Sequence, residues 1–309
     1  MKASVIIATY GRDGCLVDTI HSVLLQDYPD FELIIVDQTA KHSPEVEAFL
    51  RNRDNPRYSY CLVTPPSLPA ARNFGVARST GEIVIFVDDD VLLDPGFIHA
   101  HVNAYNRSER IAAVGGRVRS GPISSQLPAI IPKGVWEGGL NYPGTAEELQ
   151  TVMGCNMSLR RSVLKEIGGF DPSYVGNALR EETDVCCRLR RAGYQIWYEP
   201  GAALDHLVAS SGGCREKEIW HSSVYYQNET LFYLRHMGLL FFCRFLLNSF
   251  RSHVWPYKQS FMFWSSLKAL AIGVLRGIRL AFFPIKLQSS VVWELNRTGD
   301  VREPSAYCP

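Results

Sequence analysis

The sequence lacks several features that would point to particular classes of protein. Its eight cysteines form no Cys-x-x-Cys pair, which argues against zinc and favours reduced thiols in the cytoplasm. Met1–Ser4 leads straight into a short apolar strand, so we expect no signal peptide. Residues 259–267 are the longest uncharged stretch of the apolar C-terminal region, and they include Gln and Ser. No membrane-spanning helix of about 20 apolar residues is therefore expected.

Acidic residues are missing from Thr230 to Trp293, a segment that holds eight Lys and Arg. The whole chain has a net charge of +1, so the remainder carries −7. A segment that is basic, aromatic and free of acids usually meets an anionic surface. We expect amphipathic helices over 231–250 and 261–283 that rest on the inner face of the plasma membrane, as a peripheral contact of a cytoplasmic protein. A helical subdomain packed on the rest of the chain, or an oligomer interface, is the alternative.

The features that are present describe a folded α/β protein. The chain has 309 residues, of which 46% are hydrophobic and 20% charged, enough for one large domain and an extension. Apolar strand patterns alternate with helical patterns through residues 4–87, which predicts right-handed connections and a largely parallel sheet. The expected strands are residues 4–9, 31–36, 57–63 and 83–87, followed by 111–118, 152–159 and 194–198.

The strongest chemical signal is an apolar strand that ends in three carboxylates. Ile83–Val87 is an unbroken run of apolar β-formers, as in a central strand covered on both faces, and Asp88, Asp89 and Asp90 follow it. Three adjacent anions repel one another, and a divalent cation such as Mg²⁺ or Mn²⁺ would relieve the repulsion. Ligands bind outside the carboxyl ends of strands in open α/β sheets. The triplet predicts a metal site; the alternative is an acidic loop that caps a helix beginning at Asp94-Pro95.

Other candidate residues stand at the ends of the expected elements. Asp37 follows a strand, where it could bond a ring N–H of a base or cap a helix, and Arg72 could clamp a diphosphate or form a surface ion pair. The acidic run Glu181–Asp184 opens a helix, so it could include a general base or only stabilise the helix dipole. His206 could be a loop histidine or a ligand that completes a metal site rich in oxygen.

Six short motifs follow one another in a recognisable order. They are Val5–Tyr10, Ile35–Asp37, Ala71–Gly75, Asp88–Asp90, Gly169–Asp171, and Glu181–Asp184 with Arg188–Tyr194. In order and spacing, across roughly residues 1 to 210 of 309, they resemble the family 2 glycosyltransferases. The resemblance implies a GT-A fold, a Rossmann-like nucleotide-diphospho-sugar transferase domain, over residues 1–210. Residues 211–309 would form a mainly helical extension. It also implies a nucleotide-diphosphate sugar donor and inversion at the anomeric carbon.

Carried over by position, the resemblance also implies roles for individual residues. Asp88 and Asp90 would hold the metal, a divalent Mg or Mn ion. His206, considered above for its side-chain chemistry and not from the resemblance, is the candidate third ligand. Gly154 and Asn156 fall in a segment that commonly lines the acceptor side. The residues expected to contact the nucleotide-sugar are Thr9, Tyr10, Asp37, Arg72, Asp88 and Asp89.

The catalytic base is left open among three carboxylates. Family members usually carry Glu-Asp where this chain has Glu181-Glu182, so Glu182 falls on the base position, with Glu181 and Asp184 as alternatives. The base would deprotonate an acceptor hydroxyl on the side of the sugar opposite the leaving diphosphate. After Asp37 the chain also departs from the family, with Gln38–Ala40 where a second acid and Gly-Ser are common.

The sequence thus predicts an inverting, metal-assisted glycosyltransferase acting on a glycan or a lipid-linked acceptor, with no nucleic-acid partner. A nucleotidyltransferase is the rival among enzymes, but it would normally need a Gly-rich, basic phosphate loop, and Tyr10–Gly14 is a poor candidate. An inactive sugar-nucleotide-binding or scaffold protein is the rival from another class. Glutamate at position 182, where family members usually carry Asp, favours that rival. The presence of Asp88, Asp90 and Arg72 weighs against it.

Overall fold

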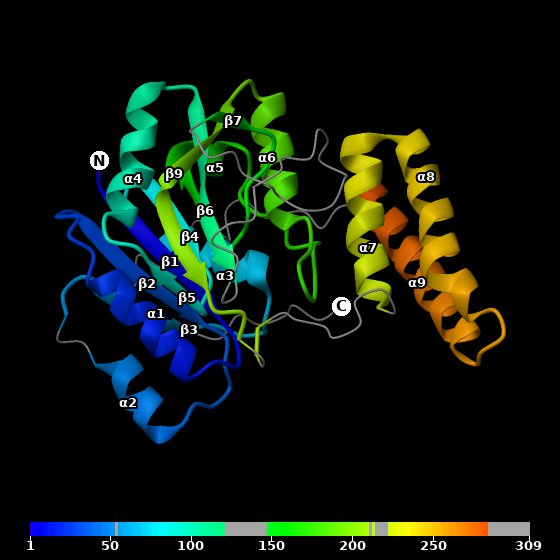
Figure 1. Ribbon diagram of the computed structural model, residues 1–309, viewed down its shortest axis with the longest axis horizontal. Coiled ribbons are helices and arrows are strands. Elements are labelled where there is room, and N and C mark those ends of the chain that lie inside the picture. The colour runs from blue at the N-terminus through cyan, green and yellow to red at the C-terminus, as the bar shows by residue number, and fades with distance from the viewer. Residues whose placement is uncertain (53–54, 121–146, 210–211, 214–221, 284–309) are drawn as a thin grey trace.

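The computed structural model describes residues 1–52, 55–120, 147–209, 212–213 and 222–283 (Figure 1). It consists of a mixed sheet with helices on its two faces and a group of C-terminal helices at one side (Figure 1). The predicted α/β architecture with a helical C-terminal region is therefore confirmed. The expected boundary between residues 210 and 211 falls outside the described residues.

The first half of the sheet follows the predicted alternation of strands and helices. Four parallel strands lie in the order β3-β2-β1-β4. The strands are β1 (Ala3–Thr9), β2 (Phe31–Asp37), β3 (Tyr58–Leu62) and β4 (Ile83–Val87), and the helices between them are α1 (Gly14–Leu24), α2 (Pro44–Arg51) and α3 (Leu68–Arg78). Because the strands are parallel, the residues that follow β1, β2 and β4 meet at one edge of the sheet.

The four strands of residues 4–87 are parallel, as predicted, whereas the second half of the sheet is mixed. Next to β4 lies β8 (Asn156–Arg160), which is antiparallel to both β4 and β6 (Ile111–Ser120). The long strand β9 (Gln195–His206) is parallel to β6, and the short strands β5 (Val91–Leu93) and β7 (Glu147–Leu149) run antiparallel to β9. Central strands buried on both faces have the same apolar pattern in either direction, so the sequence pattern does not separate the two.

The segment after the Asp triplet also differs from the expectation. The chain enters β5 at Val91, and α4 (Phe97–Ala104) begins only after Gly96, which is its N-cap at φ 76°. The Asp94 side chain accepts hydrogen bonds from Arg119 instead of capping the helix. The triplet therefore lies in a turn between two strands, β4 and β5, and Asp94-Pro95 is not a helix start.

Two apolar cores separate the helices onto the two faces of the sheet. Helices α1, α2 and α4 cover one face, where Val5 and Ile7 of β1 contribute. Helices α3, α5 (Arg161–Glu166) and α6 (Glu181–Arg191) cover the other face, to which Ile6 of β1 belongs. The alternation along β1 is the two-residue period of a strand buried on both sides. Helix α6 thus brings its acidic first turn to the face opposite α1.

The C-terminal helices form a third apolar cluster beside the sheet. They are α7 (Ser223–Phe232), a π-helical segment (Tyr233–Met237), α8 (Leu239–Ser249), a second π-helical segment (Phe250–Val254), a 3₁₀ turn (Trp255–Tyr257) and α9 (Met262–Phe282). Helix α7 lies on the side that faces α6 (Figure 1). In the described part of the chain no helix combines the length and the apolar character needed to cross a membrane.

Candidate active site

The three carboxylates after β4 are held by side chains from neighbouring segments. The Thr9 hydroxyl donates a 2.7 Å hydrogen bond to Asp89, and Arg12 lies 3.6 Å from Asp89 and 3.3 Å from Asp90. Asp89 and Asp90 are buried, whereas the Asp88 side chain is 36% exposed. The triplet therefore offers one accessible carboxylate, and the other two are fixed behind it.

Asp89 and Asp90, the two buried carboxylates, have different pKa values because their surroundings differ. Burial raises the pKa of Asp89 to about 6, although its bond from Thr9 acts in the opposite direction. Burial would also raise the pKa of Asp90, but hydrogen bonds from His206 and from the Ala209 N–H outweigh it and hold the value at about 2. Asp90 is therefore a permanent anion near neutral pH.

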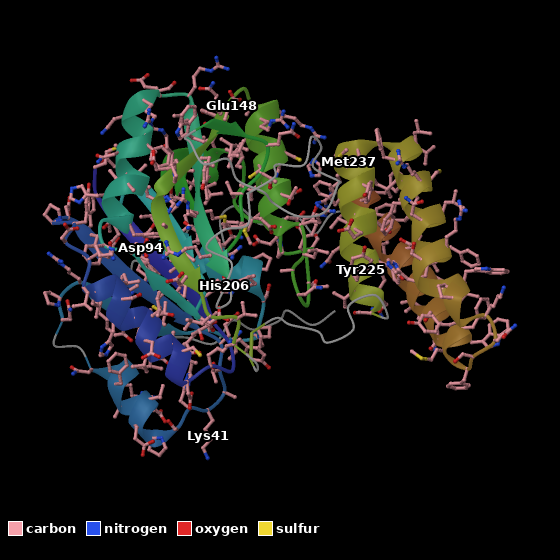
Figure 2. The ribbon with its side chains drawn as sticks, viewed as in Figure 1. Lys41, Asp94, Glu148, His206, Tyr225 and Met237 are labelled. Atoms are coloured by element: carbon pink, nitrogen blue, oxygen red, sulfur yellow. The ribbon has the colours of Figure 1, made fainter. Side chains whose placement is uncertain are left out.

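A candidate metal site forms where β4 and β9 end. Pairing of β5 with β9 sets Val91 opposite His206, the last residue of β9 (Figure 2). The imidazole Nε2 lies 3.1 Å from an Asp90 oxygen. One ligand atom each from Asp88, Asp90 and His206 lies within 4.8 Å of the others. Carboxylate oxygens and an imidazole nitrogen are donors that Mn²⁺ and Mg²⁺ sites use. The donor set fits a divalent ion.

Arg72 links the triplet to the second group of carboxylates. Its guanidinium is buried, forms an ion pair with Glu181, and lies 3.7 Å from Asp88. It also donates a 3.0 Å hydrogen bond to the Gly154 carbonyl. A Cβ at Gly154 would lie 3.0 Å from Arg72, so glycine allows this close approach. The positions predicted for donor, acceptor and base residues thus meet at Arg72.

The three candidate bases have different surroundings. Glu181 is buried and paired with Arg72. Asp184 is buried and accepts hydrogen bonds from His236 (2.7 Å) and Arg188 (2.8 Å). Burial would raise the pKa of Asp184, but these partners outweigh it and lower the pKa.

Glu182 differs from the other two carboxylates in its partners. It is half-buried, and within the described residues it forms no ion pair. Burial raises the pKa of Glu182, and the charge of Asp88 adds to the rise, while Arg72 and Arg180 oppose it. A raised pKa makes a carboxylate a stronger base, so Glu182 has the chemistry that proton abstraction requires.

Asn156, expected on the acceptor side, is a residue of the core. Its carbonyl oxygen lies 2.9 Å from His101, and its amide nitrogen donates to the carbonyls of Arg117 and Ala202 at 3.0 Å each. The side chain is fully buried, so it fastens β8 to β6 and β9 and does not face the site. His101 is buried with it, which lowers the pKa of the imidazole to about 4.

Of the residues expected to contact the nucleoside, Tyr10 is accessible to a ligand and Asp37 is not. Tyr10 is 43% exposed at the open edge. Asp37 is fully buried, and its two oxygens accept hydrogen bonds from the Thr39 N–H (2.8 Å) and from Tyr60 (2.7 Å). His42 lies 2.7 Å from the same Asp37 oxygen as Tyr60. Asp37 therefore lies beneath the edge of the sheet within an internal network.

Two residues of the site carried no signal in the sequence. Arg12 lies in the loop Tyr10–Gly14, which has no periodic pattern, yet it pairs with two of the three Asp residues. His42 joins Asp13 (2.6 Å) to Asp37 (2.7 Å) and so ties the start of α1 to the end of β2. The pairing of β1 with β2 brings Asp13 near Asp37, and the pairing of β1 with β4 brings Arg12 near the triplet.

The family of the chain follows from comparison with known proteins. A model described as Glycosyl transferase family 2 matches residues 4–168, more than half of the chain. The chain belongs to this family. It is a glycosyltransferase, and the resemblance noted in the sequence is confirmed.

Curated relatives of this glycosyltransferase are similar over about two thirds of its length. A glucosyl-dolichyl phosphate glucuronosyltransferase of Haloferax volcanii is 28% identical over 219 residues, which cover 67% of this chain and 70% of the relative. A poly-β-1,6-N-acetyl-D-glucosamine synthase of Staphylococcus epidermidis is 25% identical over 216 residues. That match covers 68% of this chain and 51% of the synthase.

Solved structures of glycosyltransferases share the fold. GalNAc-T7, solved with UDP, GalNAc and Mn²⁺, has a TM-score of 0.62 at 13% identity and covers 88% of this chain and 54% of its own. S. aureus TarS 1–349 with UDP-GlcNAc has a TM-score of 0.55 at 16% identity, covering 95% and 78%. These likenesses confirm the predicted GT-A fold.

The His42 network predicts a dependence of stability on pH. Burial would lower the pKa of His42, but its hydrogen bonds to Asp13 and Asp37 raise the pKa above the usual 6.5. The folded protein therefore holds this proton more tightly than the unfolded chain. The stabilisation is complete below pH 6.5 and is lost as the pH rises through the folded value. His42→Gln should cost about 2 kcal/mol of unfolding free energy at pH 6 and less at pH 9.

Urea unfolding at the two pH values measures this difference. His99→Gln is the control, because the His99 side chain is 46% exposed and pairs only loosely, at 3.6 Å, with Asp27. A cost of His42→Gln that is the same at pH 6 and pH 9 would contradict a charged His42.

Proposed function

We propose that this protein is an inverting glycosyltransferase that uses a divalent metal and a nucleotide-diphosphate sugar. The acceptor is a hydroxyl of a glycan or of a lipid-linked sugar. One observation carries the proposal: Asp88, Asp90 and His206 offer ligand atoms within 4.8 Å of one another, and Arg72 connects this group to the carboxylates at the start of α6. A metal and diphosphate site beside a candidate base is what a single displacement at an anomeric carbon requires.

The donor side uses the end of β4 and its surroundings. Asp88 and Asp90, with His206, would hold a Mg²⁺ or Mn²⁺ ion, which when bound would neutralise negative charge on the leaving diphosphate. GalNAc-T7 and the Pyrobaculum calidifontis mannosyltransferase PcManGT, at a TM-score of 0.53, were both solved with Mn²⁺, which supports the proposal.

The nucleoside lies, in this proposal, along the edge formed by β1 and β2. The exposed ring of Tyr10 is available to contact the base. Thr9 acts through its bond to Asp89, and Asp37 acts through Tyr60 and the Thr39 N–H, because both side chains are buried and already bonded. Thr9 and Asp37 therefore position the residues of the donor site and do not contact the donor themselves.

Glu182 is the proposed general base. Its carboxylate takes the proton of the acceptor hydroxyl as that oxygen attacks the anomeric carbon. The bond from this carbon to the diphosphate oxygen breaks on the opposite side, so the configuration inverts. Glu181 is committed to Arg72 and Asp184 to His236 and Arg188, which leaves Glu182 as the carboxylate with a raised pKa and no fixed partner among the described residues.

The acceptor class is inferred from the relatives. The Haloferax volcanii relative is named for a dolichyl phosphate-linked sugar, and the Staphylococcus epidermidis relative for a polysaccharide. Both acceptors present sugar hydroxyls. We extend that shared chemistry, and not either named product, to this protein.

The C-terminal helices are proposed to rest on an anionic membrane, at its cytoplasmic face. Exposed apolar side chains occur on α8, on α9 and on the segment between them, with Phe261 at 92% and Trp264 at 70% exposure. Basic side chains are exposed among them, and no acid occurs between Thr230 and Phe283. The exposed basic residues are Arg244, Arg251, Lys258, Lys268, Arg276 and Arg279. The end of the basic segment, residues 284–293, lies outside the described residues.

Nucleotide binding should depend on metal and on Asp90. Calorimetry with UDP, GDP and dTDP, with and without Mn²⁺, should find one nucleotide whose affinity rises with the metal. Asp90→Asn should abolish that rise, because it removes a charged ligand. Asp205→Asn is the matched control, since Asp205 precedes His206 in β9 but pairs with Arg119. Equal binding with and without metal would exclude the metal role.

Turnover should depend on Glu182. Glu182→Gln keeps the shape and removes the basicity, so kcat should fall by roughly 10²-fold or more, the usual size of general-base catalysis. Donor affinity should change little. Steady-state release of the nucleoside diphosphate measures the effect. Near-normal turnover in Glu182→Gln, together with loss of turnover but not of donor binding in Asp184→Asn, would assign the base to the other carboxylate.

Membrane contact should respond to salt and to exposed aromatic residues. The full-length protein should sediment with anionic vesicles at low salt and less at high salt, since each basic residue near the surface adds about 1 kcal/mol. Phe261→Ser/Trp264→Ser should weaken sedimentation at both salt levels. Leu25→Ser/Leu62→Ser, which alters exposed leucines elsewhere, is the control. Wild-type protein that stays in the supernatant at low salt would favour the packed-subdomain alternative.

A further inference from the structure

The loop that leads into α6 has an unfavourable backbone. Ala178 has φ 51° and Arg180, the N-cap residue of α6, has φ 79°, although neither is glycine. The N-cap side chain makes no capping hydrogen bond. Such conformations persist only where surrounding groups hold them, and they concentrate at functional sites. Glu181 and Glu182 follow this loop directly, so whatever holds the loop also fixes the start of the proposed catalytic helix.

Residues of α7 hold the loop. Asn228, which is fully buried, accepts a 3.3 Å hydrogen bond from the Val175 N–H and donates a 3.0 Å bond to the Val175 carbonyl. Glu229, also buried, pairs with Arg180 through both of its oxygens, at 2.7 Å from Nε and 3.3 Å from the second nitrogen. A two-point contact of this kind fixes the direction of the guanidinium as well as its distance.

The π-helical segment after α7 holds the other end of the same helical turn. His236 Nε2 lies 2.7 Å from Asp184, and Arg235 forms an ion pair with Asp171. Arg191, at the end of α6, donates hydrogen bonds to the carbonyls of Arg235 (3.0 Å) and His236 (3.3 Å). Contacts from the C-terminal helices therefore reach both sides of Glu182, at residues 180 and 184.

Helix α7 is itself fixed from behind by α9. Added Cβ atoms at Gly273 and Gly277 would lie 2.3 Å from the Ser223 carbonyl oxygen and 2.6 Å from the Thr230 Cβ, so the two helices are in backbone contact. Tyr225 of α7 (Figure 2) also packs against Phe245 of α8, with the ring centroids 6.4 Å apart. A helix packed this closely on one side and bonded to α6 on the other has little freedom to shift.

We propose that Glu229 and His236 are positioning residues for Glu182. They hold Arg180 and Asp184, the residues two before and two after Glu182, and thereby fix the direction in which the Glu182 carboxylate points. Transfer is sensitive to displacements of about 1 Å in such groups. The C-terminal helices are then part of the catalytic scaffold, in addition to any contact with a membrane. This inference rests on the proposed role of Glu182 as the base.

Glu229→Gln in the full-length protein is the test. It keeps the shape of the side chain but removes the charge that holds Arg180. Turnover is measured as release of nucleoside diphosphate, with whichever UDP-, GDP- or dTDP-sugar gives the highest rate with Mn²⁺. We expect kcat to fall about 10-fold or more while the donor KM and the calorimetric Kd of the nucleotide change less than about 3-fold.

The control is Glu47→Gln, the same substitution in another Arg–Glu pair. Glu47 pairs with Arg51 at 2.8 Å on the exposed surface of α2, away from α6. Its kcat should equal that of the wild type. A kcat of Glu229→Gln equal to that of Glu47→Gln would overturn the inference, because α7 would then only pack against the sheet.

A second variant covers the case in which Glu229→Gln fails to fold, which would appear as loss of nucleotide binding together with turnover. Arg180→Lys keeps the charge but not the two-point contact. A fall in its kcat with unchanged nucleotide affinity supports the inference, and full turnover overturns it. Glu182→Gln is run in the same assay. Full activity there means that the proposed role of Glu182 as the base has failed, whereas loss there with full activity in Glu229→Gln means that only the positioning role has failed.

Discussion

The mutual repulsion of three adjacent carboxylates after β4 is the constraint on which the rest of the site depends. Each carboxylate is compensated from a different part of the chain. Thr9 comes from β1, Arg12 from the loop after it, Arg72 from α3 and His206 from the end of β9. The order of strands in the sheet makes this possible, because β1 lies beside β4 and β5 carries the chain from the triplet to β9. The fold therefore concentrates negative charge at one edge and leaves Asp88 accessible there.

The same compensation links the donor side to the candidate base. Arg72 pairs with Glu181 and lies 3.7 Å from Asp88, so one buried guanidinium sets the position of the first turn of α6 relative to the triplet. From α6 the contacts continue through Glu229 and His236 into the C-terminal helices. These ion pairs form a continuous series of contacts from the triplet through α6 to the C-terminal helices.

Sequence reasoning succeeded where a local pattern reflects the position of a residue in the sheet. The apolar run before Asp88 identifies a central strand, and the rules for parallel sheets bring Asp88, Asp90 and Arg72 to one edge. It failed where tertiary pairing decides. The direction of β8 and the three-residue strand β5 depend on partners far along the chain, so no local pattern predicts β5 between the triplet and Asp94. Asn156 was expected at the acceptor side, but its amide bonds are completed by His101, Arg117 and Ala202, which no local pattern relates to it.

The anomeric configuration of the product tests most directly whether a single base and a single displacement operate at this site. The donor is an α-linked nucleotide sugar. The measurement is the NMR coupling constant of the anomeric proton in the first product, which distinguishes an α linkage from a β linkage. Attack by an acceptor oxygen deprotonated by Glu182, opposite the diphosphate held at Asp88 and Asp90, predicts a β-linked product. An α-linked product would contradict it, because retention requires two displacements or attack from the side of the leaving group.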